Sequence, residues 1–145
     1  MIKKLIMAVS FTVTTSVNAG TLLMGGITAG EDKAFDKQIY DMVYQSHYEP
    51  IKKRFGNNFS VYATAIFAYD ERQKFCSVSF SSVVGTGNGG KIMKIDGEAM
   101  PSANTIKSST NVSEYECGAL LGKAIFENQR QLLKQTNETF ARNML

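Results

Sequence analysis

Two cysteines constrain the fold of this chain more than any other feature of its sequence. Cys76 and Cys117 are the only ones among 145 residues, so one intramolecular pairing is open to them. Cys76 lies in a segment of alternating apolar and polar residues, whereas Cys117 lies at the start of a segment with helical periodicity. If the chain is exported to an oxidising compartment, we expect a disulfide that holds the last helix on a sheet.

The first residues have the three parts of a secretory signal peptide, which we predict to cover residues 1–19. Lys3 and Lys4 form the positive n-region, and residues 5–13 form an apolar run of h-region length. Residues 17–19 (Val-Asn-Ala) then offer the small side chains that a signal peptidase reads, so cleavage is expected before Gly20.

An uncleaved membrane anchor is the alternative interpretation of this leader. A membrane span needs about 20 apolar residues, and the hydroxyl side chains at positions 12 and 14–16 end the apolar run well short of that. The expected cleavage site is not followed by cysteine, which argues against a lipoprotein. Because so short a leader is typical of bacteria, we expect the protein in the periplasm or outside the cell.

The size and composition are those of one globular domain. Hydrophobic residues make up 43% and charged residues 20% of the chain, which argues against disorder. The formal charge of +3 includes both lysines of the leader; without them, 14 basic residues face 13 acidic ones, a net of +1. This balance does not favour nucleic acid or an anionic membrane as a partner. We therefore expect an irregular lead-in over 20–30 and a single α+β domain over 31–145.

The two cysteines lack the spacing of a metal or redox site. No Cys-x-x-Cys occurs and His47 is the only histidine, so we expect neither a metal nor a cofactor. A bond between the cysteines closes a loop of about 40 residues, which stabilises a fold by about 4 kcal/mol in the chain-entropy description. The pair is therefore predicted to be structural.

The residues after the lead-in predict a helix over 31–48. Residues 28–31 (Thr-Ala-Gly-Glu) have the spacing of a capping box. An apolar stripe with helical spacing follows, formed by Phe35, Ile39, Met42 and Val43. Pro50 should stop or bend this helix, and residues 51–55 would add one more turn.

Two segments of period two predict an antiparallel hairpin. Residues 59–69 and 75–84 alternate between apolar and small polar side chains, and residues 70–73 (Asp-Glu-Arg-Gln) form the turn. Residues 85–90 match Gly-x-Gly-x-x-Gly, but a dinucleotide site needs a helix to begin there. Residues 91–96 instead have the character of a third strand, so we interpret the glycines as a hairpin loop.

A polar connector is expected over 100–111, and a long helix follows it. Ser113 and Glu116 have capping-box spacing, and a buried stripe is predicted at Cys117, Leu120, Leu121, Ala124 and Ile125. A helix that continues to about residue 142 would overhang a sheet of three strands. Its last turns would then either fray or bind a partner.

The order of these elements resembles the C-terminal domain of TolA, part of the wider TonB/TolA C-terminal fold. Residues 116–121 (Glu-Cys-Gly-Ala-Leu-Leu) are similar to the second-cysteine turn of that family, and residues 73–78 (Gln-Lys-Phe-Cys-Ser-Val) are similar to its first-cysteine strand. The resemblance covers at most residues 35–128. It implies an envelope domain that binds other proteins through an exposed strand edge. The residues themselves predict the α+β fold: an N-terminal helix, a three-stranded antiparallel sheet, a long C-terminal helix and one disulfide.

The sequence also departs from this family. The connector between the cysteines is longer, residues 59–69 add a strand before the first cysteine, and we do not expect the membrane anchor and helical stalk of TolA. The energy-coupling role of that family is therefore not implied.

The sequence offers little for catalysis. His47 lies among aromatic residues near the end of the first helix, where it is expected to be a surface or packing residue. Glu114 and Glu116 are two apart and point to different sides of a helix, and no nucleophile has an identifiable base. We therefore expect no enzyme, although a small hydrolase with an unrecognised site is an alternative.

The function that we predict is that of an exported periplasmic domain that binds another envelope protein without catalysis. The expected contacts come from a sheet edge and the C-terminal helix, with six candidate residues: Tyr62, Thr64, Tyr69, Leu132, Leu133 and Phe140. The alternative within the same class is an immunity or inhibitor protein that neutralises a secreted toxin or a cell-wall hydrolase.

Overall fold

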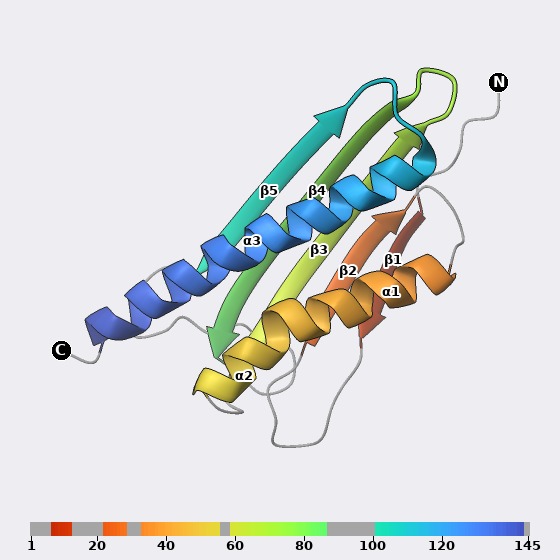
Figure 1. Ribbon diagram of the computed structural model, residues 1–145. Coiled ribbons are helices and arrows are strands. Elements are labelled where there is room, and N and C mark those ends of the chain that lie inside the picture. Colours follow the sequence, from red (N-terminus) through yellow and green to blue (C-terminus); the bar gives the residue numbers. More distant parts are fainter. Residues whose placement is uncertain (1–6, 13–21, 29–32, 56–58, 87–100, 144–145) are drawn as a thin grey trace.

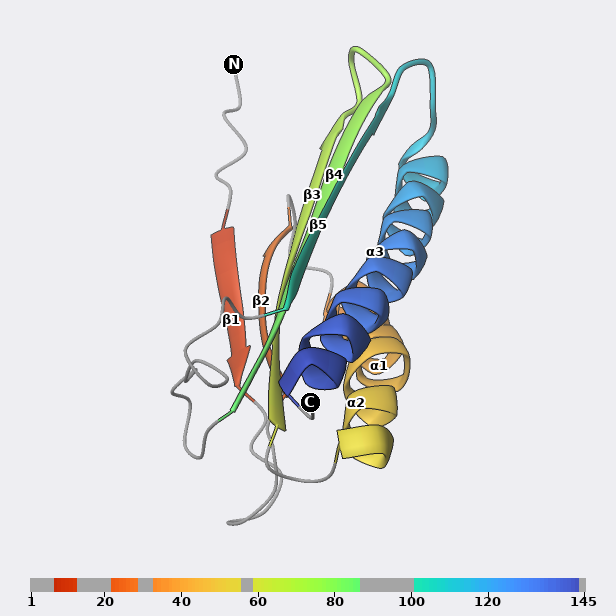
Figure 2. The same ribbon diagram turned by 90° about the vertical axis from the view of Figure 1, so that its left-hand side faces the viewer.

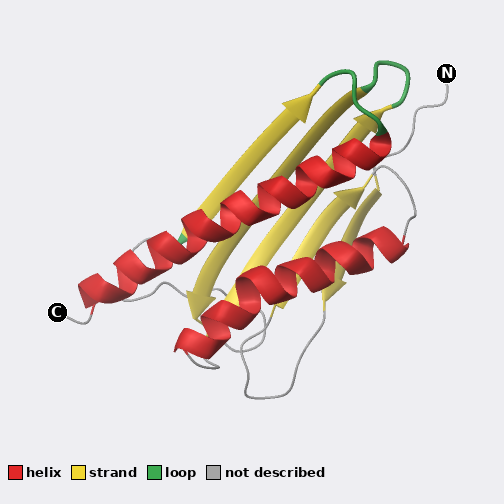
Figure 3. Ribbon diagram, in the orientation of Figure 1, coloured by secondary structure: helices red, strands yellow, loops and turns green. Residues whose placement is uncertain are grey.

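The computed structural model describes residues 7–12, 22–28, 33–55, 59–86 and 101–143 (Figures 1 and 3). Five strands, one long helix and one interrupted helix make up these residues. In chain order they are β1 Met7–Thr12, β2 Leu22–Thr28, α1 Lys33–Val43, η1 Tyr44–Tyr48, α2 Glu49–Phe55, β3 Phe59–Asp70, β4 Phe75–Thr86, β5 Ser102–Ser109 and α3 Glu114–Asn143.

The strands form one sheet in the order β1-β2-β3-β4-β5. All neighbouring strands are antiparallel except β2 and β3, which run parallel over seven residue pairs. A parallel pair needs a crossover, and the helices between β2 and β3 provide it. The β3–β4 hairpin is the longest pairing and forms the centre of the sheet.

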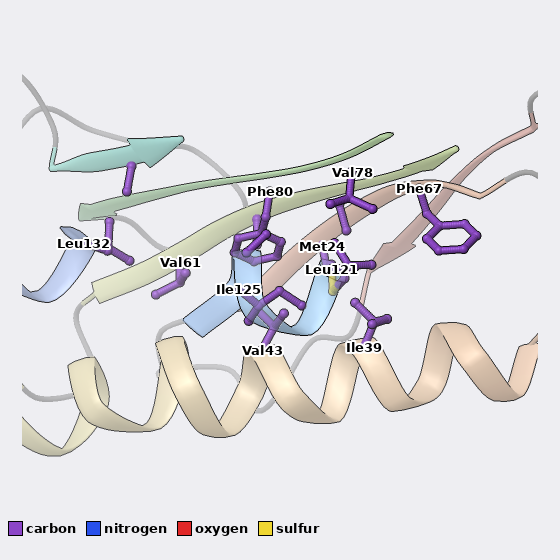
Figure 4. Packing of buried hydrophobic residues seen from close by; sticks show 14 of the residues in the cluster. Met24, Ile39, Val43, Val61, Phe67, Val78, Phe80, Leu121, Ile125 and Leu132 are labelled. Carbon is purple, nitrogen blue, oxygen red and sulfur yellow. The ribbon is translucent and has the colours of Figure 1, made fainter. Parts of the chain in front are cut away.

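The interrupted helix (α1, η1 and α2) and the long helix α3 lie on the same face of the sheet, and no described helix covers the other face (Figure 2). Alternate strand residues therefore point into a core between the sheet and the helices (Figure 4). This core contains Val61, Ala63, Ala65 and Phe67 of β3; Cys76, Val78, Phe80 and Val84 of β4; Ile39 and Val43 of α1; and Cys117, Leu121, Ala124, Ile125 and Leu132 of α3.

The structure confirms the α+β fold with an N-terminal helix, three antiparallel strands, a long C-terminal helix and one disulfide. It adds two strands that the sequence did not predict. β2 occupies residues 22–28 of the stretch expected to be irregular, where Leu22 and Met24 are buried in the core. β1 lies within the stretch expected to be the signal peptide.

Pro50 was expected to stop or bend the first helix, and it does not stop it. The helix widens into a π-helical turn over Tyr44–Tyr48, in which the Glu49 N–H bonds to the Tyr44 carbonyl, and α2 continues from Glu49. Proline lacks an N–H for the carbonyl four residues before it. The π-turn changes the bonding pattern just before Pro50, and the helix continues past it.

The prediction of a polar connector over 100–111 was wrong, because β5 occupies Ser102–Ser109 and pairs with β4. The third strand predicted at 91–96 and most of the glycine loop lie outside the described residues. β5 is polar because only one of its faces is covered: Ala103 and Thr105 are buried under α3, while the alternating Ser102, Asn104 and Ile106 are exposed.

The last helix does not overhang the sheet in the way that was expected. α3 extends to Asn143, and Leu132, Thr136 and Thr139 in its later turns are buried. The capping box at its start is confirmed: the Glu116 N–H donates to Ser113 Oγ at 3.2 Å, and the Ser113 N–H donates to the Glu116 carboxylate at 2.6 Å.

Candidate interaction surface

The predicted disulfide is present and joins the central hairpin to the first turns of α3. The Cys76–Cys117 bond has a Cα–Cα distance of 5.5 Å, and both side chains are fully buried. Cys76 shares the core face of β4 with Val78 and Phe80, and this alternation places the thiol under the helix. The bond therefore fixes the start of α3 relative to the sheet.

A buried polar cluster connects the π-turn, β4 and α3. His47, Ser82 and Asn128 each have at most 2% of their surface exposed. The Oδ1 of Asn128 lies 3.1 Å from His47 Nε2 and also accepts a hydrogen bond from Ser82 Oγ, while its Nδ2 donates to the Phe80 carbonyl at 3.0 Å. The π-turn places His47 over the ring of Phe80, at a centroid distance of 5.1 Å.

The partners of His47 define its tautomer and its charge. Because Asn128 Oδ1 only accepts, His47 Nε2 carries the proton, and Nδ1 accepts from Ser46 Oγ at 2.7 Å. Burial lowers the pKa of His47 to about 4, and the hydrogen bond to Asn128 offsets part of that effect. A neutral ring whose two nitrogens are both hydrogen-bonded and enclosed is a packing residue, as predicted, and the cluster is structural.

The candidate interaction surface is the sheet face opposite the helices, which we call the open face. It consists of the outward-pointing residues where β3, β4 and β5 are all paired, and none of these is charged: Tyr62, Thr64, Ile66, Ala68, Ser77, Ser79, Ser81, Val83, Ser102, Asn104, Ile106 and Ser108. Beyond them, Asp70 and Phe75 lie on the same side at the hairpin end of β3 and β4. Most of these side chains are short.

The strand register groups the open face into rows. Ile66 lies level with Ser79 and Ile106, and Thr64 lies level with Ser81 and Asn104. Ser81 Oγ donates to Asn104 Oδ1 at 2.9 Å, so this polar pair is satisfied within the sheet. Ile106 is 68% exposed and Ile66 is 37% exposed. Two isoleucines thus flank a serine among uncharged neighbours, an apolar feature suited to a protein contact.

The structure places the six predicted contact residues in different environments. Thr64 is exposed on the open face. Tyr62 is half-buried on the same face, and its hydroxyl is buried without a hydrogen-bond partner among the described residues. Burial also raises the pKa of Tyr62. Thr64 and Tyr62 are the two predicted residues that the fold places on the open face, and of these Thr64 is the exposed one.

The other four do not join them. Tyr69 faces the helix side, where its hydroxyl donates to the Val112 carbonyl at 2.9 Å and holds the segment before α3. Leu132 is fully buried, so it offers no contact surface, and Leu133 packs against the core. The side chain of Phe140 lies outside the described part of the structure.

Sequence reasoning missed Ile66, Ile106 and Asn128. The sequence predicts a polar connector for residues 102–109, so it does not place Ile106 on a strand. Without that strand, Ile66 has no apolar neighbour across the sheet. A signal for Asn128 was present: it continues the α3 stripe of Leu121, Ile125 and Leu132, where a polar side chain must find buried partners.

A second exposed feature lies on the outer side of α3. Gly122, Lys123, Phe126, Glu127 and Arg130 line a shallow depression there, and Phe126 is 60% exposed. Glu127 also forms an ion pair of 2.7 Å with Lys107 of β5. Since the ion pair is partly exposed, it contributes little stability.

Gly122 allows a prediction about stability that leaves the open face unchanged. A Cβ atom added at this position would meet nothing within 4 Å, and glycine in a helix interior is less favourable than alanine by about 1 kcal/mol. We expect Gly122→Ala to raise the free energy of unfolding by about that amount in urea titrations followed by circular dichroism. Gly118→Ala, at a half-buried position nearer the disulfide, is a comparison. A lower stability for Gly122→Ala would contradict the prediction.

The described residues also bear on metal sites and membrane spans. These residues contain no group of three or more histidine, cysteine, aspartate or glutamate side chains that could hold a metal ion. In the same part of the chain, no helix is both long enough and apolar enough to cross a membrane.

Comparisons with known proteins add little. No protein-family model matches the chain, and a search of curated proteins gives no significant match. A search of solved structures gives the crystal structure of lipoprotein GNA1162 from Neisseria meningitidis, with 18% sequence identity and a TM-score of 0.23, covering 66% of this chain and 67% of that one. At that TM-score the likeness supports no conclusion on fold or function, and the resemblance to TolA is not confirmed.

Proposed function

We propose that this chain is an exported, non-enzymatic domain of the bacterial cell envelope that binds another protein through its open face. The observation that carries the proposal is the row formed by Ile66, Ser79 and Ile106. Its isoleucines are exposed among the open-face residues, none of which is charged; Asp70, on the same side, lies four residues away along β3 at the hairpin turn. Removing such apolar area from water favours association.

The composition of the open face favours a protein partner over a small molecule. Small-molecule sites are lined mainly by hydrophobic and aromatic side chains. On the open face, serines, a threonine and an asparagine surround the isoleucines with hydrogen-bonding groups. An apolar centre with a polar rim is the usual arrangement of a protein interface.

Export is supported by two features that do not depend on each other. The leader carries a positive segment, an apolar run and a small-residue cleavage site. The Cys76–Cys117 geometry suits a disulfide, which persists in an oxidising compartment such as the periplasm. Together they favour a periplasmic location.

Ile106→Lys tests the proposed surface. We expect this change to reduce the recovery of a stoichiometric partner at least tenfold, because it places a charge at the apolar centre of the interface. The tagged, exported chain would be captured from the periplasm, and the proteins recovered with it quantified by mass spectrometry. Since Ile106 is largely exposed, the melting temperature should change little.

Phe126→Lys is the matched control, because it makes the same change at an exposed apolar residue on α3. We expect it to retain the partner. Loss of the partner with Phe126→Lys and not with Ile106→Lys would move the binding surface to α3. If the native chain recovers no partner, the proposed function is wrong.

A further inference from the structure

β2 belongs to the core of the fold, and each of its two edges pairs with a neighbouring strand. Leu22 and Met24 are 2% and 6% exposed, and β2 pairs with β3 from Leu22↔Val61 to Thr28↔Phe67. On its other side β2 pairs with β1, antiparallel, from Met7↔Thr28 to Thr12↔Leu23. β2 is therefore held in place by β3 whether or not β1 is present.

β1 lies inside the predicted signal peptide, so cleavage after residue 19 removes it from the exported chain. Six residues of β2 then lose their pairing partners, and β2 becomes an edge strand. The exposure of this edge rests on the predicted export and cleavage, and it does not depend on binding at the open face.

The β2 edge lacks the features that normally protect an edge strand. Natural edges carry charges, proline or bulges that prevent pairing with another chain. Residues 22–28 (Leu-Leu-Met-Gly-Gly-Ile-Thr) contain neither charge nor proline, whereas the β5 edge carries Lys107 and is otherwise mostly polar. Two adjacent glycines within a strand also suit a close approach of another backbone.

We propose that, in the exported chain, β2 of a second copy occupies the position of β1 and forms a symmetric dimer. β1 shows that this edge accepts an antiparallel strand. Two identical strands that pair antiparallel are related by a two-fold axis, so the contact closes after two copies and no third chain is added. The two sheets become one continuous sheet across the axis.

The same symmetry fixes the register. An axis perpendicular to the sheet keeps the helices of both copies on one side, and directly opposed residues share a face. Only a register centred on Gly25 then pairs all seven residues of β2, with Leu23 opposite Ile27 and Met24 opposite Gly26 of the second copy. The open faces of both copies lie on the same side of the dimer.

The first test is the mass of the exported chain. It would be purified from the periplasm with its native leader encoded, its N-terminus determined by mass spectrometry, and its molar mass measured by light scattering across a dilution series. We expect a start at Gly20 and twice the chain mass at high concentration. A strand pair buries less than a standard interface, so dissociation is expected in about the micromolar range. A start at Met1, or a monomer throughout, would overturn the proposal, and the N-terminus separates these two failures.

Cysteine substitutions test the register. Gly25→Cys places the new thiols at opposed positions, where Cα atoms are about 4.5–5.5 Å apart, within the range of a disulfide. We expect a covalent dimer on a non-reducing gel. Leu23→Cys, two residues away on the same face, would place the thiols about 14 Å apart and should not cross-link. Equal cross-linking of both variants, or of neither, would rule out this register and with it the proposed dimer.

Discussion

The double change Cys76→Ala and Cys117→Ala is expected to lower the free energy of unfolding by about 4 kcal/mol. The bond closes a loop with a sequence separation of 41 residues, and its removal restores the conformational freedom of that loop in the unfolded chain. Both sulfurs are also fully buried, so their replacement by methyl groups leaves a small cavity between β4 and α3. Domains are typically stable by 5–15 kcal/mol, so this loss is a large part of the total.

Urea titrations of the oxidised native chain and the double variant would measure the difference. The reduced native chain is the control, since it loses the bond without losing the sulfur atoms. We expect reduction to account for most of the effect of the double variant. A difference below about 1 kcal/mol between oxidised and reduced protein would show that the bond does not constrain this fold.

The part of the fold that could be predicted is the part in which sequence pattern and burial agree. In β3 and β4, alternate residues are core residues, so period two was sufficient to locate both strands and to place Cys76 on the inner face. The Ser113 capping box and the apolar stripe likewise located the start of α3. These elements are amphipathic, and each has one covered and one exposed face.

The strands at the sides of the sheet could not be predicted in the same way. β5 contributes Ala103 and Thr105 to the covered side, and these are too small and too polar to stand out from a connector. β2 contains two glycines, which lower strand propensity, and its place in the sheet depends on a long-range parallel pairing with β3. Pairing over such distances leaves no local signature.

Only part of the open face could be predicted from the sequence. Tyr62 and Thr64 could be assigned to an exposed strand face from alternation alone. The row of Ile66 and Ile106 arises from the register of three strands, and one of these had been read as a connector. The polar residues around Leu132 predict an exposed contact, but Leu132 lies on the buried side of α3.

The buried histidine predicts how stability depends on pH. His47 is neutral and enclosed in the folded protein, where burial holds its pKa at about 4, against an ordinary value of 6.5 in the unfolded chain. Between these two values the unfolded chain binds more protons than the folded one, so stability falls as the pH falls. The contribution of neutral His47 is complete above about pH 6.5 and is lost progressively toward pH 4, with a total of about 3 kcal/mol.

His47→Gln isolates this contribution, because glutamine does not titrate and can still donate a hydrogen bond to Asn128 Oδ1. The free energies of unfolding of both proteins would be measured in urea from pH 7.5 to pH 4. The pKa of Glu116 is lowered by its hydrogen bonds with Ser113, so its contribution begins to be lost only as the pH falls below 4.5, equally in both proteins. We expect the native chain to lose about 3 kcal/mol more than the variant. Parallel pH profiles would mean that His47 is protonated in the folded state without cost, and that the cluster with Ser82 and Asn128 opens to water.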